Sequence, residues 1–174
     1  KRIGNVGQAC TSNKRMIVME DIYDEFVQAL VDLASSYSEG DPLNPREGTE
    51  FYPLSSRDAA ELLAQQLRLA VDEGANLRVG GEVTGKGAYI TPAVITDIPV
   101  GSDSYYEEFF GPVAEVYKVA SEEEAIELAN EVDRKVWELG FSALLYQTPG
   151  VVGVRDKLAN FGPAGLATID YTKI

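Results

Sequence analysis

The 174-residue sequence contains no histidine and a single cysteine, Cys10. The absence of histidine excludes Cys-His and Ser-His catalytic pairs, histidine metal ligands and the usual general base near neutral pH. One cysteine excludes an internal disulfide and a zinc site built from several cysteines, so we expect no bound metal. Any chemistry must use the thiol, carboxylates, lysines, tyrosines and backbone amides. A lone thiol fits the reducing cytoplasm, where we expect the protein to be located.

Long apolar segments are also missing, and basic residues are few. No apolar run approaches the roughly 18 residues that a membrane span needs, and the first residues lack the apolar core of a signal peptide. The 15 basic residues are outnumbered by 28 acidic ones, which gives a net charge of −13. A surface this acidic repels phosphate backbones and anionic lipids, so we expect neither nucleic acid nor a membrane as a partner.

The pattern that is present is typical of an α/β domain. The length suits one domain with a real core, and we expect residues 1–174 to form it. Strand-like apolar segments alternate with amphipathic helical segments, which favours a mostly parallel sheet. The expected strands cover 15–19, 76–79, 89–96, 112–119, 141–146 and 166–170. The expected helices cover 21–37, 55–73, 121–130 and 150–161.

Capping and turn signals refine these elements. Asp21 is placed to cap the first helix, and Gly74 is placed to end the second. Ser121 with Glu124 forms a capping box for the third. The glycine-rich stretch 80–89 lacks the spacing of a phosphate-binding loop, so we predict a hairpin-like turn. The apolar face of the first helix is predicted to contain Ile22, Phe26, Ala29, Leu30 and Leu33.

Two loop-like stretches carry residues suited to chemistry. The first, NVGQACTSNKRMIV (residues 5–18), holds Cys10 among small or polar residues. A lone cysteine is often a buried structural residue, and this alternative stays open. The other alternative is a nucleophile. Cations such as Lys14 and Arg15 stabilise a thiolate, and the backbone amides around residues 7–11 would suit an oxyanion.

The second stretch, YYEEFFGPVAEVY (residues 105–117), places two carboxylates beside two aromatic rings. One interpretation is an acidic surface pair, Glu107 and Glu108, next to a core aromatic pair. The other is a ligand site, in which a carboxylate accepts hydrogen bonds from hydroxyls, such as those of a sugar, and an aromatic ring packs against a ligand ring. Gly111 permits close approach of the backbone.

Together, the two stretches resemble the aldehyde dehydrogenase superfamily. GQAC at 7–10 matches that family's nucleophile motif GQxC, and EEFFGPV at 107–113 matches its E-(I/F)-F-G-P motif. Four further segments resemble the family in the expected order: GDPLNP at 40–45, AVDEGANLRVGG at 70–81, AYITPAVITDI at 89–98 and EEAIELAN at 123–130. The resemblance covers about residues 1–130, and within the family the sequence resembles bacterial succinate-semialdehyde dehydrogenase-like sequences. It implies the three-layer α/β/α fold of the family's catalytic domain.

The resemblance implies a role for each matching residue. Cys10 would be the thiolate that attacks an aldehyde carbon, and its own backbone amide would help to hold the oxyanion. Hydride would pass to NAD or NADP, and water would release the acid from a thioester. Glu108 would bind the hydroxyls of the nicotinamide ribose, and Phe110 would pack near the nicotinamide.

Other family features have no counterpart in the sequence. These are the cofactor-binding domain, the general-base glutamate, the oxyanion-hole asparagine and the bridging strands of the family's oligomers, and residues 131–174 diverge from the family. We therefore expect a catalytic-domain fragment, with engineering of the C-terminal end as one explanation. Three functions stay open: the catalytic domain of an NAD(P)-dependent aldehyde dehydrogenase, a stand-alone folded domain without turnover, and a cofactor-free thiol esterase that uses Cys10.

Overall fold

A computed structural model of the chain describes residues 2–46, 48–84 and 87–138. The chain divides into a unit of residues 1–132 and a second unit of residues 133–174. The strands expected at 141–146 and 166–170 and the helix expected at 150–161 lie outside the described residues. The expectation of one domain over the whole chain stays a prediction.

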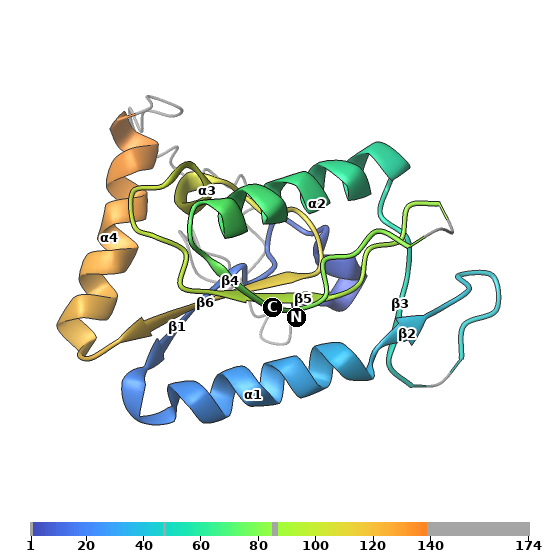
Figure 1. The fold of residues 1–174 in the computed structure, drawn as a ribbon, viewed down its shortest axis with the longest axis horizontal. Helices are drawn as coiled ribbons and strands as arrows, with labels where there is room; N and C mark the ends of the chain where they lie inside the picture. The colour runs from blue at the N-terminus through green and yellow to red at the C-terminus, as the bar shows by residue number, and fades with distance from the viewer. Residues whose placement is uncertain (1, 47, 85–86, 139–174) are drawn as a thin grey trace, which may run out of the picture. The chain divides into compact units, whose positions relative to one another are not determined.

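The first unit is built on a four-stranded sheet, and a helix covers each face of it (Figure 1). Its strand order is β1 (Arg15–Met19), β6 (Val113–Val119), β5 (Ala93–Thr96) and β4 (Asn76–Val79). The first three strands are parallel, and β4 is antiparallel to β5. Helix α1 (Glu20–Ser36) covers one face and α2 (Arg57–Asp72) the other. The predicted α/β class with a mostly parallel sheet is confirmed. The other elements of the described residues are η1 (Gly4–Gly7), β2 (Ser38–Glu39), β3 (Glu50–Phe51), α3 (Asp103–Tyr106) and α4 (Glu122–Glu138).

Two apolar layers form because both faces of the central strands are covered. Along β6, Val113 and Tyr117 pack on the α2 side, whereas Ala114 and Val116 pack on the α1 side. This is the alternation expected of a strand. Because both sides are buried, the strand contains a nearly continuous apolar run, as parallel strands usually do. Only Lys118 of β6 is exposed.

Helix α1 differs from the prediction in its cap and in its buried face. It begins at Glu20 directly after β1, and its N-cap residue, Met19, provides no side-chain cap, so the prediction of Asp21 as the cap is wrong. Ile22 and Leu33 are 55% and 46% exposed. The buried residues are Tyr23, Val27 and Ala34, with Phe26 and Leu30 partly buried. The strand runs into the helix without a loop, so the path of the chain sets the rotation of the helix and turns Ile22 outward.

The ends of α2 and the turn after β4 agree with the prediction. The Ser56 side chain accepts a hydrogen bond from the Ala59 backbone N–H at 3.1 Å, and Gly74 follows the helix with a φ of +115°. A backbone hydrogen bond from Gly81 to Thr91, at 3.1 Å, belongs to the hairpin predicted at 80–89.

Two predicted boundaries are wrong. The strand expected at 89–96 begins only at Ala93, because Pro92 has no N–H to donate to a ladder. Helix α4 continues to Glu138 rather than ending near residue 130. Half of its predicted capping box is present, since Ser121 accepts from the Glu124 backbone N–H at 3.2 Å. The Glu124 carboxylate accepts from the backbone N–H of Ala120, one residue before the cap, at 2.6 Å instead of from Ser121.

Candidate functional site

The two chemically suited stretches meet at one end of the sheet. Cys10 lies in the loop that leads into β1, and Glu108 and Phe110 lie in the segment that leads into β6. These strands are parallel neighbours, with Arg15 opposite Glu115 in register. Parallel strands begin at the same edge of a sheet, so the fold brings together two stretches that are far apart in the sequence.

The glycines of the two motifs allow this approach. A Cβ on Gly7 would lie 2.0 Å from the Gly111 carbonyl oxygen, and Gly7 has a φ of +70°. A Cβ on Gly111 would in turn lie 2.2 Å from Cδ2 of Leu63. The glutamine of GQAC fixes the loop from the other side, because the Gln8 side-chain oxygen accepts a hydrogen bond from the Ser55 backbone N–H at 2.8 Å.

Cys10 is an exposed free thiol. The alternative of a buried structural cysteine is therefore wrong. The thiol lies in a turn closed by a hydrogen bond from the Ser12 N–H to the Ala9 carbonyl at 3.0 Å. Just before it, Asn5 and Val6 have φ values of +52° and +53°. A β-branched residue in this left-handed region is rare, and such backbone strain gathers at functional sites.

Lys14 joins the three predicted site residues. Its Nζ lies 2.6 Å from Oε1 of Glu108 and 5.7 Å from the centre of the Phe110 ring. It also donates to the carbonyls of Ala9 and Cys10, at 3.5 and 3.4 Å. The sequence indicated Lys14 only as a nearby cation, and the contact with Glu108 becomes visible only in the fold.

The aromatic pair predicted next to the carboxylates is split by the structure. Phe109 is fully buried, whereas Phe110 is 45% exposed. Glu108 keeps a side chain that is 56% exposed, and Glu107 accepts a hydrogen bond from Gln66 of α2. Phe109 therefore anchors the segment in the core, while Glu108 and Phe110 remain open to a ligand. The interpretation as a core aromatic pair holds for Phe109 alone.

Two arginines fasten the backbone of the second stretch. Arg2, which is 6% exposed, donates from Nη2 to the carbonyls of Phe109, at 2.9 Å, and Gly111. Arg15 donates to the carbonyl of Tyr105. Burial lowers the pKa of Arg2, and nearby carboxylates oppose that effect. The two side chains hold the segment at both ends.

Glu115 compensates this positive charge inside the fold. Its carboxylate is 1% exposed and lies 3.2 Å from Nε of Arg15. Burial raises the pKa of Glu115, and Arg15 is the main opposing influence. Neither Arg2 nor Glu115 is among the site residues predicted from the sequence. A carboxylate inside the apolar run VAEVY was the available signal.

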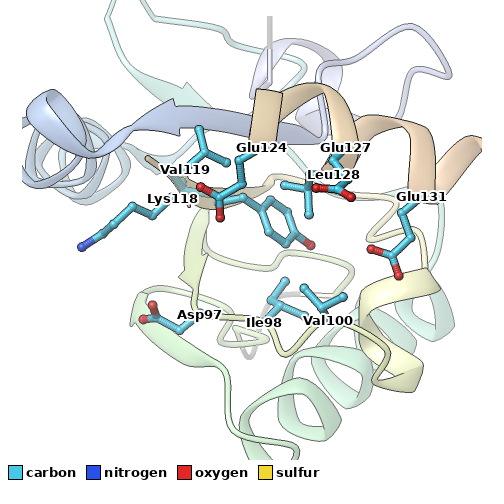
Figure 2. A pocket seen from close by; sticks show the side chains of 11 residues that line it. Asp97, Ile98, Val100, Lys118, Val119, Glu124, Glu127, Leu128 and Glu131 are labelled. Carbon is cyan, nitrogen blue, oxygen red and sulfur yellow. The ribbon is translucent and has the colours of Figure 1, made fainter. Parts of the chain in front are cut away.

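A separate cavity of about 350 Å³ lies at the carboxyl end of β6. Figure 2 shows Glu124, Glu127 and Glu131 of α4 on one side of it and Asp97 and Ile98 on the other. None of the three predicted site residues lines this cavity. It is therefore distinct from the candidate site.

The described ranges show neither a membrane-spanning helix nor a metal-binding cluster. Within 2–46, 48–84 and 87–138, no helix is both long and apolar enough to cross a membrane. The same ranges hold no group of three or more acidic or cysteine side chains placed to bind a metal ion.

Comparisons with known proteins agree with the motifs. The aldehyde dehydrogenase family profile matches residues 1–136. A protein of Deinococcus radiodurans named succinate-semialdehyde dehydrogenase, with NADP(+) in its name, is 45% identical over 130 residues. That match covers 74% of this chain and 27% of the relative. A similarly named protein of Mycobacterium ulcerans is also 45% identical, over 74% of this chain and 28% of its own length.

Solved structures support the same assignment. The Streptococcus pyogenes succinic semialdehyde dehydrogenase in complex with NADP+ is 44% identical, with a TM-score of 0.69 over 75% of this chain and 28% of that chain. A Bacillus cereus aldehyde dehydrogenase in complex with NAD+ is 35% identical, with a TM-score of 0.68 over 74% of this chain and 26% of that chain. The chain thus spans a little over a quarter of the relatives it matches. With the GQAC and EEFFGP stretches joined in one site, it belongs to the aldehyde dehydrogenase family.

Proposed function

We propose that this chain provides the thiol-bearing catalytic part of an NAD(P)-dependent aldehyde dehydrogenase. The observation that carries the proposal is the exposed Cys10 thiol joined through Lys14 to the open carboxylate of Glu108 and the open ring of Phe110. The names of the relatives favour succinate semialdehyde as the aldehyde and NADP as the cofactor. We place the activity in the cytoplasm, because a reactive thiol must stay reduced.

The described residues fit the nicotinamide end of such a cofactor. Only Oε1 of Glu108 is held by Lys14, so the second oxygen is available to accept hydrogen bonds from ribose hydroxyls. The exposed Phe110 ring offers an apolar face for the nicotinamide. When bound, the nicotinamide supplies a hydride acceptor.

Cys10 would perform the covalent step. Its sulfur attacks the aldehyde carbon, a C–S bond forms, and the negative charge moves to the former carbonyl oxygen. The backbone N–H of Cys10 would donate to that oxygen. After oxidation the substrate is held as a thioester, whose C–S bond water then breaks to release the carboxylic acid and the thiol.

The proposal is tested in a chimera in which a full-length relative provides the rest of the enzyme. Residues 1–136 of this chain would replace the matching stretch of the Deinococcus radiodurans relative, and NADPH formation from succinate semialdehyde and NADP+ would be followed. We expect turnover, because the segment carries both motifs in their joined geometry. Cys10→Ser should lower kcat by about 1000-fold or more, since the nucleophile is lost. Glu108→Gln should raise the KM for NADP+ about 10-fold, since a charged acceptor is lost.

Other outcomes would support different functions. If the chimera folds and does not turn over, the chain is a folded domain without dehydrogenase activity. If the 174-residue chain instead cleaves an activated ester such as 4-nitrophenyl acetate, and Cys10→Ala abolishes cleavage, the thiol esterase alternative is supported. Folding of the chimera would be checked by circular dichroism, so that misfolding is not mistaken for inactivity.

A further inference from the structure

We infer that Lys14 is a positioning residue that ties the Cys10 loop to Glu108 and so fixes the spacing between the thiol and the cofactor-binding carboxylate. The inference deepens the proposed function, on which the assigned roles of Cys10 and Glu108 rest. The contacts themselves do not depend on that assignment.

The geometry of the ammonium group supports this role. Lys14 Nζ lies 2.6 Å from Glu108 Oε1, slightly closer than the roughly 2.7–2.9 Å of a charged N–H···O hydrogen bond. The same nitrogen faces the carbonyls of Ala9 and Cys10, at 3.5 and 3.4 Å. An ammonium group has three donors and no acceptor. These three oxygens therefore use its full capacity, and two of them belong to the loop that carries the thiol.

Burial distinguishes this contact from an ordinary surface ion pair. The Lys14 side chain is only 17% exposed, while that of Glu108 is 56% exposed. Exposed pairs usually contribute little to stability because both side chains are mobile and solvated. Here the lysine is confined, with the Phe110 ring 5.7 Å away. A confined lysine holds the more open carboxylate, and it leaves one Glu108 oxygen free for a ligand.

The two nearby arginines, unlike Lys14, hydrogen-bond to the backbone of the segment that carries Glu108. Arg2 and Arg15 donate to backbone carbonyls at the two ends of the 105–111 segment. Their hydrogen bonds fix where the backbone runs, while the charge of Glu108 acts on Arg2 without a hydrogen bond between the two side chains. Within the residues that the structure describes, Lys14 is the cation that contacts both the Glu108 side chain and the thiol loop.

A zero-length cross-link tests the contact directly in the 174-residue chain. Carbodiimide activates a carboxylate and joins it by an amide bond to an amine in contact with it. We expect mass spectrometry to find a Lys14–Glu108 cross-link in the wild type and none in Lys14→Met or Glu108→Gln. Absence of the cross-link in the wild type would overturn the inference. Lys118, which lies over the Tyr23 ring at the other end of β6, serves as the lysine control.

The alkylation rate of Cys10 tests whether the contact matters for the thiol. With iodoacetamide at one fixed pH, Lys14→Met should slow the reaction about 3- to 10-fold, because the loop loses its cation and its anchor. Lys14→Arg should restore at least about half of the wild-type rate, since arginine is also cationic. Lys118→Met should leave the alkylation rate of Cys10 unchanged. An unchanged rate in Lys14→Met would overturn the inference.

A double-mutant cycle shows whether Glu108 acts through Lys14. In the otherwise wild-type chain, Glu108→Gln should change the alkylation rate of Cys10. In the Lys14→Met background, the same substitution should leave that rate unchanged, because the contact between residues 14 and 108 is already lost there. An equal effect in both backgrounds would overturn the inference. None of these measurements needs turnover. A chimera without turnover would reject the proposed function, while a Lys14–Glu108 cross-link and a coupled cycle would still support this inference. A chimera with turnover, without the cross-link or the coupling, would support the proposed function and reject this inference.

Discussion

Gly7 illustrates at the residue scale how the two motifs depend on each other. Its φ of +70° is unfavourable for any residue with a side chain, and the Gly111 carbonyl occupies the place of a Cβ. The Gly111 carbonyl and an added Cβ at Gly7 are both held by the backbone, so neither could rotate away. The glycine of GQAC therefore serves the packing of two loops as well as the conformation of its own turn.

Replacing Gly7 should destabilise the fold and displace the site. We expect Gly7→Ala to lower the free energy of unfolding by about 2 to 4 kcal/mol, from combined backbone strain and overpacking. Urea denaturation followed by circular dichroism would measure it. Gly4→Ala is the matched control, because nothing lies within 4 Å of a Cβ at Gly4. Equal effects of the two substitutions would contradict the argument.

At the scale of elements, local signals predicted some helix ends and not others. Gly74 and Ser121 lie at helix ends as predicted, because a cap needs only the neighbouring backbone. Asp21 does not cap α1, which begins directly after β1. The buried face of α1 could not be predicted the same way. Its rotation depends on the direct connection from β1, which periodicity alone does not contain.

The cap of α2 should contribute measurably to stability. Ser56→Ala removes the acceptor for the Ala59 N–H and should lower the free energy of unfolding by about 1 kcal/mol. Ser55→Ala is the neighbouring control: Ser55 uses its backbone N–H toward Gln8, which alanine retains. Thermal unfolding of both variants would test this. A larger loss for Ser55→Ala would show that the cap had been assigned to the wrong residue.

For the whole molecule, two glutamates should give opposite dependences of stability on pH. Burial raises the pKa of Glu115 above the ordinary value of 4.5. Hydrogen bonds from Ser104, with a further one from the Asp103 backbone, lower the pKa of Glu73 below it. A raised carboxyl pKa means that the folded state holds its proton more tightly than the unfolded chain. A lowered pKa means the reverse.

The two carboxyl groups lose their contributions to stability in opposite directions of pH. The contribution of Glu115 is present below pH 4.5 and is lost as the pH rises through its raised native pKa. The contribution of Glu73 is present above pH 4.5 and is lost as the pH falls through its lowered native pKa. Relative to Glu115→Gln, the wild type should therefore lose stability on alkaline titration. Relative to Glu73→Gln, it should lose stability on acid titration. Urea denaturation of the three proteins from about pH 2.5 to 8 would test this, because the contribution of Glu73 is lost below pH 4.5, and slopes of the same sign would contradict it.

The sequence by itself determined the alternating α/β pattern, the main caps, the exclusion of histidine chemistry and, through GQAC and EEFFGP, the family. These depend on composition, periodicity and short spacings, which are local properties of the sequence. Tertiary structure alone decided that Cys10 is exposed, that Phe109 and Phe110 face different surroundings, and that Lys14 contacts Glu108. The physical reason is that β1 and β6 become neighbours only when the sheet forms. Contacts across that pairing join residues whose separation in the chain gives no local signal of their meeting.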